Sequence, residues 1–128
     1  MEYQTNVPAQ LQEEFDGWNF IKSFNAIQEK VNATAHEKGW YDKPAEDGTR
    51  IALMHSELSE ALEGLRHGNP PSDKIGDLGF SQVEEEFADC IIRILDVSQE
   101  RKWRIGEAIL AKAKYNEGRS HRHGGKQF

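Results

Sequence analysis

The chain is short of cysteine and of long apolar runs, and each shortage excludes a class of protein. Its single cysteine, Cys90, cannot form a disulfide within the chain, which favours a reducing compartment and a place in the core. No apolar stretch approaches the roughly 18 residues of a membrane-spanning helix, and no basic-then-apolar leader opens the sequence. We therefore expect a cytoplasmic protein that does not enter membranes.

Positive charge is also scarce, with 16 lysines and arginines against 22 aspartates and glutamates and a net charge of -6. This balance argues against nucleic acid or a membrane surface as the partner of the whole chain. The 128 residues suffice for one small domain, but only 37% are hydrophobic. We expect residues 1–17 to form a flexible leader, and residues 18–128 to form a single domain whose core a second copy completes.

Apolar residues recur at helical spacing, and no segment alternates as a strand would. The pattern predicts helices over Trp18–Lys38, Gly48–Arg66 and Trp103–Glu117. Between the last two, Ser81 and Glu84 form a capping-box pattern that opens a further helix. Four helices with short connections predict an all-α protein, namely a four-helix bundle. The second helix is expected to carry its apolar stripe on Ile51, Met54, Leu58, Leu62 and Leu65.

Two pairs of acids stand out because each borders an apolar stripe. Glu57 and Glu60 lie on the second predicted helix, and Glu86 and Asp89 on the third. Each pair has i, i+3 spacing, so both carboxylates project from one helix face. Two such charges about 5 Å apart cost roughly 3 kcal/mol at an effective dielectric near 20. A cluster of four is therefore most reasonable around a hard divalent cation, although solvated helix faces carry similar acids.

The neighbours of these pairs fall on other faces or serve other roles. Glu63 points outward, while Glu84 and Glu85 suit the start of a helix. Gly64, on the acid stripe, indicates that a ligand or another helix passes close by. Arg93 follows Asp89 by one turn, where it can hold a metal-binding carboxylate or contact a phosphate.

Positive groups concentrate near the end of the chain. Lys112, Asn116 and Arg119 share one line if the last predicted helix continues as far as Arg119, and a tail with His121, Arg122, His123 and Lys126 follows. Together they form a plausible anion clamp, with His123 and Lys126 as tail contacts to phosphate. The alternative is a flexible, solvated tail.

A base-reading surface is a further expectation on the first helix. Asn25, Asn32 and His36 share one side, and Trp40 and Tyr41 follow directly. An aromatic face with amide hydrogen bonds can recognise a nucleobase, so Asn32 and Trp40 are candidate substrate contacts. The alternative is that Trp40 covers the core while the polar residues face water.

These motifs together resemble the MazG-like all-α nucleoside triphosphate pyrophosphohydrolase superfamily. Its pattern E-x-x-E, spacer, E-x-x-D is matched by Glu57 to Glu60, 25 intervening residues, and Glu86 to Asp89. The segment from Lys112 through Asn116 to Arg119 is similar to the family's motif on the last helix, and the tail resembles that of a small phage and bacterial subgroup. The match covers about residues 18–128.

The resemblance implies an enzyme that uses Mg²⁺, with Mn²⁺ as a substitute, to hydrolyse the α–β bond of a nucleoside triphosphate to monophosphate and pyrophosphate. By position, Glu57, Glu60, Glu86 and Asp89 would be metal ligands, and Glu57 or Glu60 would also serve as the base. Lys112, Asn116 and Arg119 would contact phosphate or sugar. The family implies a homodimer or homotetramer.

Two rival functions stay open. The first is a non-catalytic helical protein that binds nucleotides or a partner through the same residues. The second is a phosphoribosyl-ATP pyrophosphatase within the same superfamily, which the tail and the long spacer make less favourable.

Overall fold

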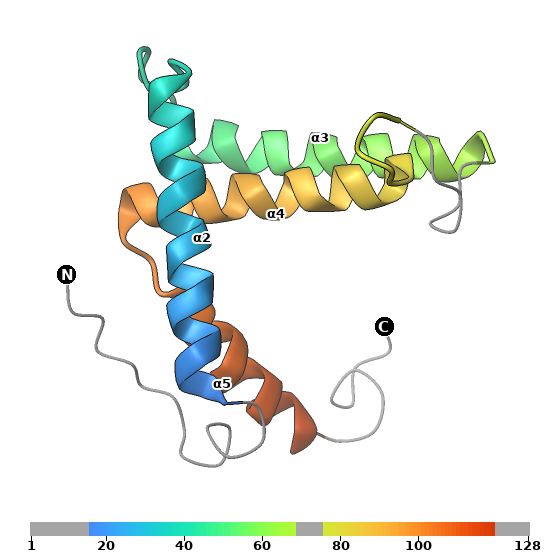
Figure 1. Ribbon diagram of the computed structural model, residues 1–128. Helices are drawn as coiled ribbons and strands as arrows, with labels where there is room; N and C mark the ends of the chain where they lie inside the picture. The colour runs from blue at the N-terminus through green and yellow to red at the C-terminus, as the bar shows by residue number, and fades with distance from the viewer. Residues whose placement is uncertain (1–15, 69–75, 120–128) are drawn as a thin grey trace. The chain divides into compact units, whose positions relative to one another are not determined.

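Every regular element in the described residues, 16–68 and 76–119 of a computed structural model, is a helix (Figure 1). In chain order they are α2 (Gly17–Glu37), α3 (Asp47–Arg66), α4 (Gln82–Arg101) and α5 (Ile105–Glu117). The all-α class is thereby confirmed. Most helix ends agree with prediction within a residue, but α5 begins at Ile105 instead of Trp103. None of these helices combines the length and the apolar character needed to cross a bilayer.

The chain forms two compact units. The larger spans Gln28–Lys102 and holds the second half of α2 with α3 and α4. The smaller holds the first half of α2 and α5. The predicted single domain over residues 18–128 stays a prediction, and most of the predicted leader, residues 1–15, lies outside the described residues.

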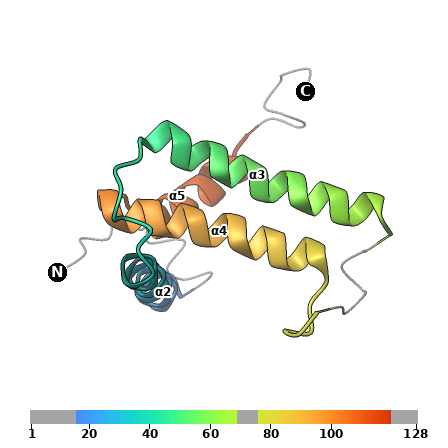
Figure 2. The same cartoon turned by 90° about the horizontal axis from the view of Figure 1, so that it is seen from above.

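In the larger unit, α3 and α4 run antiparallel, side by side (Figures 1 and 2). The face of α3 that is buried carries Glu57, Ala61 and Gly64. A Cβ atom on Gly64 would lie 3.3 Å from the Gln82 side chain of α4, tighter than most contacts. The close approach predicted at Gly64 is therefore confirmed, and the neighbour is a side chain of α4.

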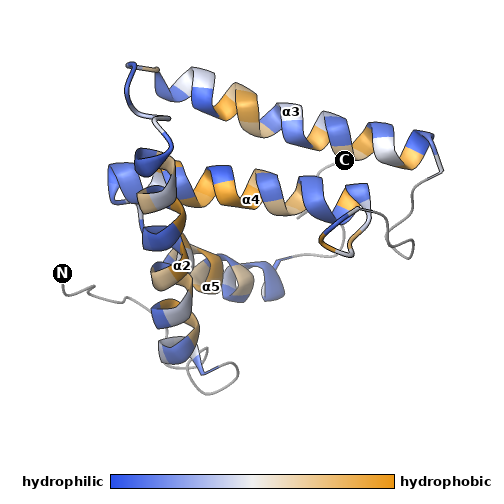
Figure 3. Cartoon of the chain, turned by 45° about the horizontal axis from the view of Figure 1, so that its top comes forward, coloured by the Kyte–Doolittle hydropathy of each residue, from blue (hydrophilic) through white to orange (hydrophobic). Residues whose placement is uncertain are grey.

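The predicted apolar stripe of α3 is not its buried face. Ile51, Leu58, Leu62 and Leu65 are each close to half exposed, and Met54 is only partly buried. Hydrophobic residues recur along α3 in Figure 3, yet the small residues Ala61 and Gly64 are the ones that let α4 come close. Within the single chain the helix therefore buries a narrower face of smaller residues, and the apolar stripe stays largely exposed.

The ends of the helices follow local sequence rules. Ser81 forms the predicted capping box: its hydroxyl accepts a hydrogen bond from the Glu84 amide, and the Glu84 carboxylate accepts one from the Ser81 amide. Lys102, at the end of α4, adopts a left-handed conformation with φ of 59°. Gly39, after α2, has φ of 83°, which glycine adopts without a steric penalty. Ser81 and Lys102 thus mark where α4 begins and ends, and Gly39 follows the end of α2.

In the smaller unit, the first half of α2 packs antiparallel to α5. Ile21 and Leu110 form its buried core, with Phe20 against them. Gly106 permits this packing, because a Cβ there would lie 3.1 Å from the Phe24 ring.

Candidate metal centre

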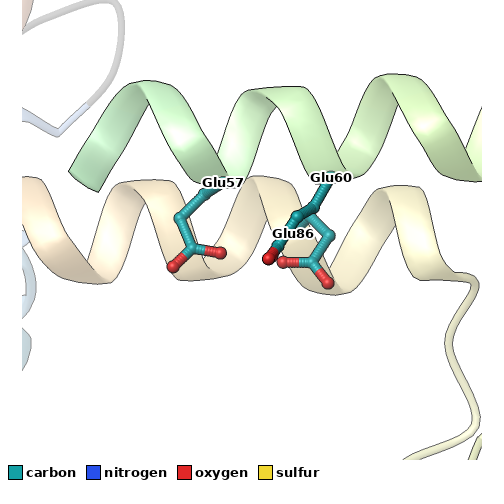
Figure 4. A group of neighbouring side chains, drawn as sticks. All are labelled: Glu57, Glu60 and Glu86. Carbon is teal, nitrogen blue, oxygen red and sulfur yellow. The ribbon is translucent and has the colours of Figure 1, made fainter. Parts of the chain in front are cut away.

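Three carboxylates from two helices converge in the larger unit. Glu57 and Glu60 come from α3 and Glu86 from α4, and one oxygen of each lies within 4.8 Å of the others (Figure 4). The i, i+3 spacing directs both α3 acids toward α4, as predicted from sequence. We call Glu57, Glu60 and Glu86 the acid triad.

Arg93 supplies the positive charge nearest to the triad. Its Nε donates a hydrogen bond to Glu57 Oε1 at 2.6 Å, and the Glu57 side chain is only 9% exposed. This bond and the guanidinium charge lower the pKa of Glu57. Arg93 was expected to pair with Asp89 within its own helix; instead it reaches across to α3. Arg93 was predicted to hold a metal-binding carboxylate, and the carboxylate that it holds is that of Glu57.

Glu86 has the opposite environment. Its Oε2 is buried and has no hydrogen-bond partner in the part of the chain that the structure describes. Burial, together with the neighbouring Glu57 and Glu60 carboxylates, raises the pKa of Glu86 to about 7. One triad member is thus stabilised in its charged form and another is destabilised.

Asp89 is not among the acids that converge. It is exposed and lines a separate pocket of about 460 Å³ with Leu78, Phe80, Ala88 and Ile92. Its assignment as a fourth ligand stays a prediction. Two acids that the sequence placed outside the metal site lie as expected. Glu63 bonds to Arg66 on the exposed face of α3, and Glu84 caps α4.

Of the predicted cationic line, Lys112 and Asn116 lie on α5 in the smaller unit, but α5 ends at Glu117 and Arg119 lies beyond it. The pairing of these residues with the triad stays a prediction. Lys112 and Arg119 both lie near the Tyr115 ring, with Lys112 Nζ 4.6 Å from its centroid. Asn116 is exposed on the same helix. The tail contacts His123 and Lys126, with His121 and Arg122, lie outside the described residues.

The two candidate base contacts, Asn32 and Trp40, lie in the larger unit with the triad, whereas Asn25 lies in the smaller unit. Asn32 Nδ2 donates a hydrogen bond to Asp96 Oδ1 at 3.0 Å. Trp40 is 51% exposed, and the Arg93 guanidinium lies 5.7 Å from its ring centroid. Trp40 is therefore about half covered, and it lies near the arginine that bonds to Glu57.

Sequence reasoning missed Arg50 and did not assign a role to Asp96. Both line a pocket with Trp40 and Arg93. A signal for Arg50 was present, since Arg50, Leu53 and Glu57 follow the i, i+3, i+7 spacing of one helix face.

The donor set fits a hard divalent ion. Three carboxylates from two rigid helices offer the oxygen ligands that Mg²⁺ prefers, and the buried Glu86 oxygen has no other partner. The set contains neither the thiolate nor the imidazole ligands typical of a structural zinc site. The arrangement can therefore bind a hard cation, and its chemistry does not distinguish Mg²⁺ from Mn²⁺.

No protein-family model matches the chain, and no curated protein or solved structure is significantly similar to it.

Proposed function

We propose that the chain is a Mg²⁺-dependent nucleotide pyrophosphohydrolase that cleaves the α–β bond of a nucleoside triphosphate. The observation that carries the proposal is the acid triad, three carboxylates within 4.8 Å that come from two antiparallel helices. Polyphosphates are ligands that complement such a site, because bound Mg²⁺ usually completes its shell with phosphate oxygens and water. The resemblance of the motifs to MazG-like enzymes supports the same reaction.

In this proposal Glu57, Glu60 and Glu86 hold the ion, and Asp89 is a further ligand. When bound, Mg²⁺ neutralises phosphate charge and lowers the pKa of bound water. Glu57 is held by Arg93, which makes it the weaker proton acceptor. We therefore assign to Glu60 the role of orienting or deprotonating the attacking water.

The phosphates also need cationic contacts outside the triad. We assign these to Lys112 and Asn116 of α5 and to Arg119, which follows it, with His123 and Lys126 of the tail. Charge complementarity supports this assignment, because these residues are the main concentration of positive groups in an acidic chain.

We further propose that the enzyme is a homodimer or homotetramer. The support is the row Ile51, Leu58, Leu62 and Leu65 on α3, whose members are between 45% and 49% exposed in the single chain. A contiguous apolar helix face of this kind is unfavourable in water and favourable against another helix.

The test is pyrophosphate release from a panel of ribo- and deoxynucleoside triphosphates with Mg²⁺. Glu60→Gln is expected to lower turnover at least about a hundredfold with helix content unchanged. Glu63→Gln is the matched control, because Glu63 lies on the same helix but pairs with Arg66 on the outer face. Nucleotide binding without pyrophosphate from any substrate would instead favour the non-catalytic binding protein. Release from phosphoribosyl-ATP alone would favour that pyrophosphatase.

A further inference from the structure

A second pocket, with charged side chains in its walls, lies beside α4, toward its C-terminal end from the acid triad. Its volume is about 210 Å³, and its walls include Trp40, Arg50, Leu53, Arg93 and Asp96. Sites for drug-sized ligands typically measure about 300–1,000 Å³, so this one suits a single flat ring system. Glu86 and Asp96 are ten residues apart on α4, or about 15 Å along the helix axis. A ligand that fills both places would extend along α4.

The walls offer both hydrogen-bond acceptors and hydrogen-bond donors. Asp96 is only 3% exposed, and a carboxylate without its proton can only accept. Burial and the nearby Asp96 also raise the pKa of Tyr41 to about 12. Arg50 and Arg93 can only donate. The half-exposed indole of Trp40 adds an aromatic face for stacking.

This combination excludes simple ions as the occupant. An anion would meet the buried Asp96 carboxylate, and a cation would meet two guanidinium groups. The complementary ligand is a neutral, flat heterocycle with adjacent donors on one edge and adjacent acceptors on another.

Among the common bases, guanine has that pattern. Its N1–H and 2-amino group are neighbouring donors, and its O6 and N7 are neighbouring acceptors that arginine recognises. Adenine and cytosine place an amino donor beside a ring acceptor, and uracil has one N–H between two carbonyls. We infer that this pocket binds the base of a guanine nucleotide, with Asp96 as the acceptor, Arg50 and Arg93 as donors and Trp40 as the stacking surface.

Arg93 connects this pocket to the acid triad through its bond to Glu57. The inference rests on the proposed function only in placing the phosphates of the same ligand at the triad. Base recognition itself requires neither metal nor hydrolysis, so the two can be tested separately.

The first experiment titrates metal-free protein with nucleoside monophosphates and follows binding by calorimetry. GMP is expected to bind at least about tenfold more tightly than IMP, which lacks only the 2-amino group, and than AMP, CMP or UMP. Equal affinities for GMP and IMP, or no binding of GMP, would overturn the inference. Pyrophosphate release without GMP preference would leave the proposed function standing, whereas GMP preference without release from any triphosphate would leave only the base pocket.

Two variants separate base recognition from stacking. Asp96→Asn puts an amide donor where guanine needs an acceptor, so GMP affinity is expected to fall about tenfold or more while XMP, with a carbonyl at that position, binds better. Trp40→Leu is expected to weaken all monophosphates alike, by about five- to a hundredfold. Glu63→Gln is the control. Unchanged GMP selectivity in a folded Asp96→Asn protein would contradict the assignment, and the comparison of GMP with IMP on the unaltered chain does not depend on that variant's folding.

Discussion

At the scale of single residues, the three carboxylates of the acid triad are stabilised to different degrees. Glu57 is buried yet has Arg93 as partner, Glu86 has a buried oxygen without one, and Glu60 is exposed. Burial of a charge is costly unless it is paired, so the triad stores a cost that a bound cation would offset.

Arg93→Met should show how far this pair stabilises the metal-free protein. The variant leaves a buried carboxylate beside two others, and the free energy of unfolding is expected to fall by about 1–3 kcal/mol in urea titrations. Arg66→Met removes a partner from the exposed Glu63 and should cost less than about 1 kcal/mol. Equal losses in the two variants would contradict the importance of the pair between Arg93 and Glu57.

The pKa of Glu86 predicts an unusual pH dependence without metal. Because it is raised from 4.5 to about 7, the folded state retains a proton that the unfolded state loses. The contribution of Glu86 to stability is thus fully present below pH 4.5 and declines as pH rises toward 7. Glu86→Gln should flatten this decline in urea titrations at a series of pH values, whereas Glu63→Gln should not. Below that window the lowered pKa of Glu57 acts in the opposite direction.

A bound metal ion should offset the cost of burying the charged Glu86 carboxylate. Saturating Mg²⁺ binds only the folded triad, so it is expected to raise the melting temperature, with chelator restoring the original value. Glu86→Gln should reduce this shift, and Glu63→Gln should preserve it. A melting temperature that does not respond to Mg²⁺ or Mn²⁺ would argue against the triad as a metal site.

At the scale of elements, α3 and α4 position the site because small residues hold them close. Ala61 and Gly64 lie on the buried face of α3 together with Glu57. The capping box at Ser81 fixes where α4 starts. The residue at which α4 begins decides which face of that helix carries Glu86, and therefore that Glu86 lies beside Glu57 of α3.

Ser81→Ala tests the cap. Ser81 is fully buried, and its hydroxyl is bonded to the Glu84 amide at 3.2 Å, so its loss should lower the free energy of unfolding by about 1 kcal/mol. The matched control is Ser59→Ala, because Ser59 lies on the exposed side of α3 and only bonds back to its own helix. Calorimetric or urea unfolding of both variants decides the point.

At the scale of the whole molecule, the exposed leucine row predicts association. Leu58→Gln with Leu62→Gln should shift the assembly toward monomers in sedimentation velocity, since two apolar contacts are replaced by polar side chains at the proposed interface. Ile27→Gln is the control, because Ile27 is also 54% exposed but lies on α2. If the unaltered chain, the double leucine variant and the Ile27→Gln control were all monomers, the proposed assembly would be contradicted.

The sequence by itself determined the helices, the capping box at Ser81 and three acids that converge. Helical spacing, the Ser81 capping box and Gly39 are local features, and local physics decides them. The same spacing placed Glu57 and Glu60 on one face and set Glu63 on another.

Only tertiary structure decided which faces are buried and which charges meet. Arg93 pairs with Glu57 across two helices because close packing at Gly64 sets the register, and no spacing within one helix contains that information. The sequence placed an apolar stripe on α3, but it did not show that the face of smaller residues packs closer and leaves the larger side chains exposed. For the same reason Asp96 and Arg50, 46 positions apart in sequence, become walls of one pocket.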